Sequence, residues 1–164
     1  DEKDIIRNSP CWLVQNPESN LNNNVGYFNS AHLGKNIMLG TDGMHSDMLQ
    51  SAKVAFYVGQ GFDIINYPLA YERFRNAHRY ISDNNFKGDG DNNLVVLDYN
   101  TPTEINQNNF LGHFIFGINS NHVHDVISNG KLIVKNREIL TVNESEILKV
   151  SRERANHLWK KMQA

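Results

Sequence analysis

The residues best placed to do chemistry lie between Lys35 and Gln50, where a short apolar run ends and Asp42 follows between Gly40 and Gly43. In proteins with parallel sheets, functional groups gather where the strands end, at the carboxyl edge. Glycine on both sides of a carboxylate lets the backbone approach closely, as an active-site turn requires. This spacing predicts Asp42 as a metal-binding, proton-handling site residue. The alternative is a structural carboxylate that caps the helix after it.

Two further features belong with this turn. His45, three residues after Asp42, is the histidine best placed to face the same site. The polar segment over 16–26 follows an earlier apolar run directly, and loops that leave a strand at this edge often contact substrate. Its asparagines could equally brace one another within the loop, so both interpretations remain open.

Other reactive side chains fit ordinary structural roles better. His122 and His124 have the spacing of a zinc-binding pair on a strand, but no third histidine lies near them and they lead straight into the hairpin over 125–130. We therefore predict two surface or edge histidines. Cys11 lies in an apolar run and is predicted to be a buried, inert thiol. Neither a glycine-rich phosphate loop nor a serine, histidine and aspartate order occurs.

The elements that would position Asp42 follow from the apolar pattern. Short apolar runs over 11–15 and 37–41 predict two buried strands. A helix is expected from about Ser46, capped by that hydroxyl, to Gly59 or Gly61, and a second helix opens at Pro68. Strand, loop, strand and helix in this order predict the end of a parallel α/β unit.

The back half has a different character. A linker rich in glycine, aspartate and asparagine over 86–93 leads to a strand over 94–99, a loop over 102–109 and an apolar segment over 110–118 whose type the pattern leaves open. Asn129-Gly130 between two β-rich runs predicts a hairpin, because both turn residues need positive φ. A helix with capping-box spacing at Asn143 and Glu146 closes the chain.

Composition limits the partners. The net charge of −2 over 164 residues gives no sign of binding to nucleic acid or to a membrane surface. The single cysteine excludes an internal disulfide framework and fits a cytoplasmic protein. A core strand begins within a few residues of Asp1, so we expect the chain to be part of a longer protein.

Two motifs together resemble the amidohydrolase superfamily: Asn-Pro-Glu-Ser-Asn-Leu-Asn-Asn at 16–23 and Leu-Gly-Thr-Asp-Gly-Met-His-Ser-Asp-Met at 39–48. Within that superfamily the chain is most similar to the chlorohydrolase and guanine-deaminase-like branch, including aminohydrolases linked to selenium metabolism. The motifs at 94–99, 109–113 and 126–131 look like the C-terminal pattern of the same branch.

The resemblance implies an α/β fold: the last two strands and helices of a (β/α)8 (TIM) barrel, the C-terminal half of a composite β-sandwich and a terminal helix. We assign residues 1–85 to the barrel, 86–142 to the sandwich and 143–164 to the helix. Two departures stand out. Gln15 occupies a position where relatives often carry histidine, and the linker over 86–91 is short and lacks the usual glycine-marked return into the sandwich.

The resemblance also implies a divalent metal, zinc or iron. Asp42 would be the aspartate that ends the eighth strand, ligates or neighbours the metal and takes a proton from the bound water. Asn16, Ser19 and Asn20 match the loop after the seventh strand and are assigned, with His45, to substrate binding. The remaining metal ligands, an early His-x-His pair and a later histidine, would lie upstream of Asp1.

The resulting prediction is the C-terminal portion of a metal-dependent aminohydrolase that deaminates a small ring or amidine-type substrate, with the full-length protein a homo-oligomer. This segment alone is expected to be inactive, since one carboxylate does not make a catalytic zinc site. A rival prediction is a non-catalytic oligomerisation or binding module that acts through exposed strands. A third keeps the hydrolase but has it cleave amide or carbon–chlorine bonds.

Overall fold

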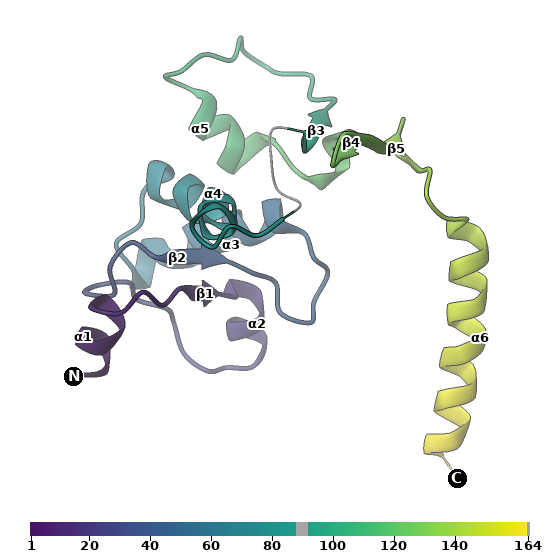
Figure 1. The fold of residues 1–164 in the computed structure, drawn as a ribbon, viewed down its shortest axis with the longest axis horizontal. Helices are drawn as coiled ribbons and strands as arrows, with labels where there is room; N and C mark the ends of the chain where they lie inside the picture. Colours follow the sequence, from purple (N-terminus) through teal and green to yellow (C-terminus); the bar gives the residue numbers. More distant parts are fainter. Residues whose placement is uncertain (88–91, 164) are drawn as a thin grey trace. The chain divides into compact units, whose positions relative to one another are not determined.

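A parallel pair of short strands organises the first part of the chain. In the computed structural model, which describes residues 1–87 and 92–163, β1 (Leu13–Gln15) pairs with β2 (Ile37–Leu39), and Val14 lies beside Met38 (Figure 1). Around this pair lie α1 (Glu2–Arg7), α2 (Pro17–Asn22), α3 (Met48–Phe62) and α4 (Tyr67–Asp83). The chain is therefore a mixed α/β fold, and the two predicted front strands are present.

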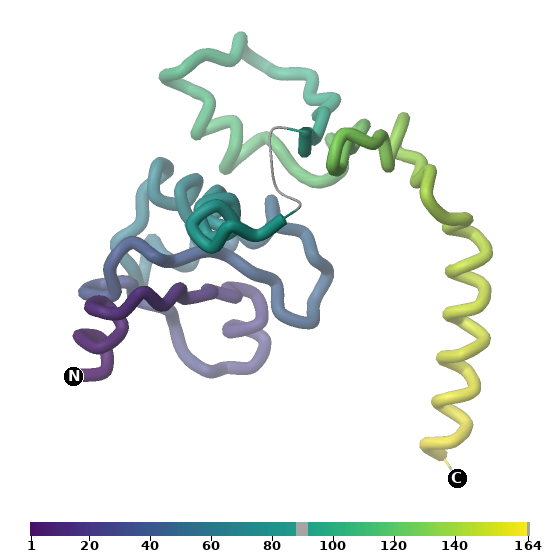
Figure 2. The backbone as a smooth tube through the Cα atoms, viewed as in Figure 1, coloured from purple at the N-terminus to yellow at the C-terminus, as the bar shows by residue number. Residues whose placement is uncertain are grey.

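The described residues form two units by their contacts: 1–87 with 99–122, and 92–98 with 123–163. The tube in Figure 2 follows the backbone through both. The predicted linker over 86–93 lies partly outside the described residues, at 88–91. Residues 99–122 pack with the first unit here, although the assigned sandwich segment includes them. The assigned boundaries of the parent domains stay a prediction.

The core of the first unit forms between β2 and the helices. The segment predicted only as apolar contributes α5 (Phe110–Gly112) and the π-helix η1 (His113–Gly117), followed by the 3-10 helix η2 (Ser120–His122). Small residues on α3 and α4 let the elements approach closely, and two residues of η1 fill the remaining space. The buried cluster consists of Leu39, Ala52, Ala55, Phe56, Ala70, Phe114 and Ile115.

The two faces of the strand pair differ. Leu39 belongs to the core beneath the helices, whereas Val14 is 49% exposed. Successive side chains on a strand point to opposite faces, so Val14 and its neighbour Met38 share the face turned away from that core. A Cβ on Gly40 would overlap Asn16 Oδ1 and lie 2.7 Å from Val14 Cγ1, which puts these groups on the same side. We call this side of the pair the open face.

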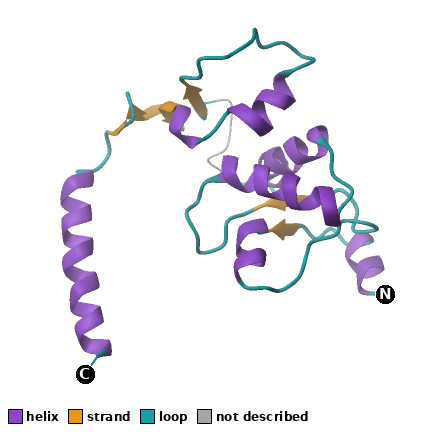
Figure 3. Cartoon of the chain, turned by 180° about the vertical axis from the view of Figure 1, so that it is seen from behind, coloured by secondary structure: helices purple, strands orange, loops and turns teal. Residues whose placement is uncertain are grey.

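The second unit is an antiparallel sheet followed by a helix (Figure 3). Its strands, in spatial order, are β3 (Leu94–Leu97), β4 (Val123–Ser128), β5 (Lys131–Lys135) and β6 (Glu138–Ile139), and α6 spans Glu144–Met162. Asn129 and Gly130 have φ of +49° and +74°, which confirms the predicted hairpin. The Asn143 side chain accepts a hydrogen bond from the Glu146 N–H at 3.1 Å, as the cap spacing predicts.

Three local predictions were wrong. The polar segment after β1 is not all loop, because Pro17 occupies the first turn of α2, where a missing N–H costs nothing. Asp47 caps α3 in place of Ser46: its Oδ1 accepts from the Gln50 N–H at 3.0 Å, while Ser46 takes φ of +59°. Cys11 is exposed, since β1 begins only at Leu13.

Across the described ranges 1–87 and 92–163, no helix has the length and apolar character that crossing a membrane requires.

Candidate functional site

Asp42 lies in the turn over 40–47 that joins β2 to α3. Its backbone is left-handed, with φ of +54°, a conformation that aspartate tolerates better than most residues. Its carboxylate accepts hydrogen bonds from Ser19 Oγ and from the Gly43 N–H, both at 2.7 Å. The Ser19 hydroxyl, followed by the Gly43 N–H, lowers the pKa of Asp42 below its ordinary value, against a smaller effect of desolvation. The carboxylate is therefore ionised at neutral pH.

Ser19 comes from α2, directly after β1. It is buried, and its Oγ accepts from Asn23 Nδ2 at 3.1 Å while it donates to Asp42. The hydroxyl is thus fixed in direction by a partner on each side. The segment after β1 and the turn after β2 meet here, as the parallel arrangement predicts.

The other predicted substrate-binding residues, Asn16, Asn20 and His45, lie in three different local environments. The Asn16 side chain lies on the open face over Gly40, and α2 receives no side-chain cap from it. The backbone of Asn20 lies within α2, where its N–H donates to the Asn16 carbonyl at 2.9 Å. His45 pairs with Glu18, with 3.1 Å between His45 Nε2 and Glu18 Oε2. Whether these side chains contact substrate stays a prediction.

Sequence reasoning missed Glu18. Its Oε2 lies 3.1 Å from both His45 Nε2 and Ser51 Oγ, so one carboxylate oxygen joins α2, the turn and α3. Glutamate in the first turn of a helix is ordinary, and nothing in the spacing distinguishes it. Only the three-dimensional contacts identify it.

Gln15 turns away from the open face. It is buried, and its Oε1 accepts from Arg73 Nη1 at 3.0 Å. The same nitrogen lies 2.8 Å from Asp63 Oδ2, in an ion pair whose side chains are each 1% exposed. Gln15 thus belongs to the packing beneath the helices.

Burial alone would raise the pKa of Asp63. Hydrogen bonds from the Ser30 hydroxyl and N–H, together with Arg73, outweigh that effect and lower the pKa of Asp63. The Asp63 carboxylate therefore remains ionised beside Arg73 at neutral pH.

The described residues do not by themselves form a metal site. Within 1–87 and 92–163, no three histidine, cysteine, aspartate or glutamate side chains gather as a ligand set. A zinc site needs at least three protein ligands. The Asp42 carboxylate fits as one ligand, because each of its oxygens accepts a single hydrogen bond from the described residues and keeps a second lone pair.

His122 and His124, the pair considered as zinc ligands, have other partners. His122 Nδ1 accepts from the Asn119 N–H at 3.0 Å, and His124 Nδ1 lies 3.1 Å from Asp125 Oδ2. Both side chains are partly buried.

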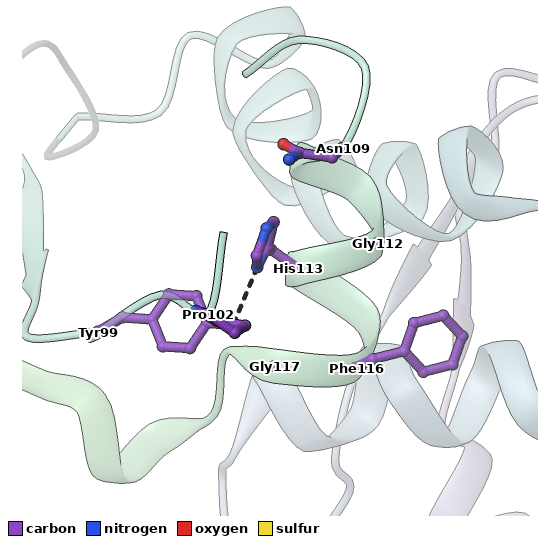
Figure 4. A pocket seen from close by; sticks show the side chains of 7 residues that line it. All are labelled: Tyr99, Pro102, Asn109, Gly112, His113, Phe116 and Gly117. Carbon is purple, nitrogen blue, oxygen red and sulfur yellow. Dashed lines mark hydrogen bonds between the residues drawn. The ribbon is translucent and has the colours of Figure 1, made fainter. Parts of the chain in front are cut away.

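A separate pocket of about 370 Å³ opens beside η1 (Figure 4). His113 faces Tyr99 there, with 3.0 Å from Nδ1 to the Tyr99 hydroxyl and 3.0 Å from Nε2 to Thr103 Oγ1. Both ring nitrogens are thus engaged, so this histidine holds the loop over 99–109 against the helix. The residues that line the pocket are Tyr99, Pro102, Asn109, Gly112, His113, Phe116 and Gly117.

Comparison with known proteins identifies relatives. A 5-methylthioadenosine/S-adenosylhomocysteine deaminase of Dictyoglomus thermophilum is 25% identical over 180 residues, covering 98% of this chain and 41% of the relative. An enzyme of the same name from Halothermothrix orenii is 25% identical over 166 residues, covering 90% of this chain and 38% of the relative. No family model matches the chain.

A solved structure shares the fold. An adenosine deaminase from Xanthomonas campestris, crystallised with bound zinc, superposes with a TM-score of 0.80 at 18% identity over 97% of this chain and 40% of that protein. These matches confirm the resemblance to deaminases of the amidohydrolase superfamily. The chain spans about 40% of the length of these relatives and corresponds to their C-terminal portion.

Proposed function

We propose, from this resemblance to deaminases of the amidohydrolase superfamily, that the chain is the C-terminal portion of a metal-dependent aminohydrolase. One observation carries the proposal: the Asp42 carboxylate, just past the end of β2, is held at 2.7 Å by Ser19 from the segment after β1. Neighbouring carboxyl ends of parallel strands are where α/β enzymes keep their sites.

Two features support placing the chain in a barrel and a composite sandwich. Helices pack against Leu39 on one face of the strand pair, and half-exposed Val14 lies on its open face. Two adjacent strands of a (β/α)8 barrel would have the same arrangement. Leu94, Val95 and Val96 of the edge strand β3 are 46–58% exposed, which fits a sheet that another segment covers. We assign the strands that would complete the barrel, and the segment that would cover β3, to the part of the longer protein outside this chain.

The chemistry that we propose is hydrolytic deamination. Water adds at the carbon that bears the amino group, and that carbon–nitrogen bond breaks to give ammonia and a carbonyl product. Zinc held by Asp42 and by ligands outside this chain would supply a water of lowered pKa as the nucleophile. Asp42, ionised because Ser19 and Gly43 hydrogen-bond to it, would accept a proton from that water on a free lone pair of its carboxylate. The proton would then pass to the departing amino group, so that ammonia leaves and the carboxylate is restored.

The remaining predicted residues bind substrate in this proposal, His45 through the exposed part of its ring, because both of its nitrogens contact protein groups. Asn16 presents its carboxamide on the open face, where one oxygen acceptor and two N–H donors suit the ring nitrogens and amino group of a purine-like or amidine-type substrate. Asn20 and His45 complete the predicted set. The names of the relatives favour adenosine-type nucleosides, including 5-methylthioadenosine and S-adenosylhomocysteine, as first substrates to test.

The test is turnover by the full-length protein, loaded with zinc: ammonia release from these nucleosides and from amidine and primary-amide compounds, and chloride release from chlorinated-ring compounds. We expect release from one of the amino-bearing compounds. Asp42→Asn should lower kcat by about 10²–10⁴-fold, as loss of a proton-transferring group does. Asp83→Asn, a matched change at an exposed helix end, should leave kcat unchanged. Full activity of Asp42→Asn would contradict the proposal, and turnover of only the amide or chlorinated compound would favour the other hydrolase chemistry.

A second candidate, a non-catalytic binding module, is favoured by the exposed edge strand β3. In that case the full-length protein would release no ammonia from any compound yet form a complex through this sheet. The proposal of an enzyme includes a homo-oligomer, which light scattering on the full-length protein measures independently.

A further inference from the structure

Glu18 connects three elements around the Asp42 turn. Its side chain is only 14% exposed, and its Oε2 lies 3.1 Å from His45 Nε2 in the turn and 3.1 Å from Ser51 Oγ on α3. Ser51 is fully buried, and its hydroxyl also lies 3.2 Å from the Gly40 carbonyl oxygen, where the turn begins. The Glu18 carboxylate therefore contacts His45 within the turn. It also contacts Ser51, the α3 side chain that holds Gly40 at the start of the turn.

The contact with His45 has a defined direction. His45 Nδ1 accepts a hydrogen bond from the Asp47 N–H at 3.0 Å, so in the neutral ring the proton resides on Nε2. That N–H then donates to Glu18. Both nitrogens of His45 are thus used within the protein, one to close its own turn and one to reach α2.

The turn needs such support. Asp42 and Ser46 have φ of +54° and +59°, a region that costs free energy for residues other than glycine. Strained residues of this kind persist only when surrounding contacts hold them. Glu18 and Ser19, adjacent residues of α2, supply two of these contacts: Glu18 to His45 and Ser19 to Asp42.

We propose that Glu18 is a positioning residue, which acts through His45 to hold the turn over 40–47 so that the Asp42 carboxylate stays on Ser19. The inference rests on the proposed function, because that function assigns Asp42 to proton transfer in the reaction. Glu18 itself contacts neither the Asp42 carboxylate nor, in this assignment, the substrate. Its effect on the reaction is therefore indirect.

Two substitutions separate positioning from a role of the charge itself. Glu18→Gln keeps an oxygen that can accept from His45 Nε2–H, whereas Glu18→Ala removes the acceptor. A positioning role predicts that Glu18→Gln keeps its activity and that Glu18→Ala loses it. A role in proton transfer or charge stabilisation predicts that both fail alike.

The experiment measures kcat and KM of the full-length, zinc-loaded protein. Glu18→Ala should lower kcat up to about 100-fold, the scale of a 1 Å misplacement, with KM changed less. Glu18→Gln should stay within the same order of magnitude as the unsubstituted protein. His45→Ala should lose at least as much kcat as Glu18→Ala, because the proposed function also assigns His45 to substrate binding, and the double variant should be no slower than His45→Ala, since Glu18 acts through His45. Glu72→Ala, an exposed matched control on α4, should change neither constant.

Equal losses in Glu18→Gln and Glu18→Ala, additive losses in the double variant, or an unchanged Glu18→Ala would overturn the inference. A readout independent of activity is the 15N NMR spectrum of the His45 ring. It should show Nε2–H in the unsubstituted protein and in Glu18→Gln, and a changed ring environment in Glu18→Ala. If the full-length protein releases no ammonia, the proposed function fails, and an identical His45 spectrum in Glu18→Ala and the unsubstituted protein would still overturn the contact.

Discussion

Gly40→Ala tests whether Asn16 and Val14 occupy the open face at the end of β2. A Cβ at residue 40 would overlap Asn16 Oδ1 and lie 2.7 Å from Val14 Cγ1, closer than nonbonded carbons approach. The φ of Gly40 is not left-handed, so the added methyl group causes no backbone strain of its own. Any loss of stability therefore reports the two side-chain contacts.

The expected magnitude follows from these contacts. Overpacking costs about 1–3 kcal/mol in folding free energy. The Asn16 carboxamide can rotate, but Val14 is β-branched and stiff about χ1. Because Val14 is 49% exposed and has room to move, we expect the lower half of that range, about 1–2 kcal/mol. Val14→Ala removes Cγ1, so the double variant should lose less than the sum of the two single losses.

Urea denaturation gives these free energies, with the m-value as a check that the unfolding transition is unchanged. Gly43→Ala is the matched control in the same turn. A Cβ there meets no atom within 4 Å, so that variant should be unchanged or stabilised by about 0.4–1 kcal/mol. Equal stability of Gly40→Ala and Gly43→Ala, or strict additivity with Val14→Ala, would refute the placement of Asn16 and Val14.

Three further predictions concern charge and hydrogen bonding. Ser19→Ala removes the largest cause of the lowered pKa of Asp42, so that pKa should rise toward its ordinary value in a 13C NMR titration; an unchanged pKa would contradict the contact. The folded-state pKa of Asp63 is also lowered, so its ion pair stabilises the fold above the unfolded-state pKa, and this contribution is lost as the pH falls through the folded-state pKa. Asp63→Asn should therefore cost about 3–5 kcal/mol of folding free energy at neutral pH, because the buried Arg73 guanidinium loses its charged partner, and it should cost less in acid. Denaturation experiments that give the same cost at both pH values would contradict this prediction. Tyr99→Phe removes one of two hydroxyl partners of His113 and should cost about 1 kcal/mol in thermal denaturation.

Local sequence signals predicted the elements around the site. The apolar runs before Asn16 and before Gly40 are β1 and β2, and the polar residues that follow them meet where the strands end. Asn129-Gly130 predicted the hairpin because positive φ at both positions is a local requirement. At this hairpin the residue types alone decide the backbone conformation.

Features that depend on distant contacts were not predictable in the same way. Ser46 and Asp47 are both good capping residues, and the fold selects Asp47 because Ser46 takes a left-handed backbone. Glu18 became visible only through His45 and Ser51, which lie on other elements. Gln15 sits at the end of a strand, but its burial against Arg73 follows from the helix packed on that face.

The most direct test of the central claim is a crystal structure of the full-length, zinc-loaded protein, with anomalous diffraction recorded at the zinc edge. Our account predicts a zinc peak in contact with the Asp42 carboxylate, which still accepts the hydrogen bond from Ser19. A zinc peak remote from Asp42, with that carboxylate bound only to protein groups, would contradict it.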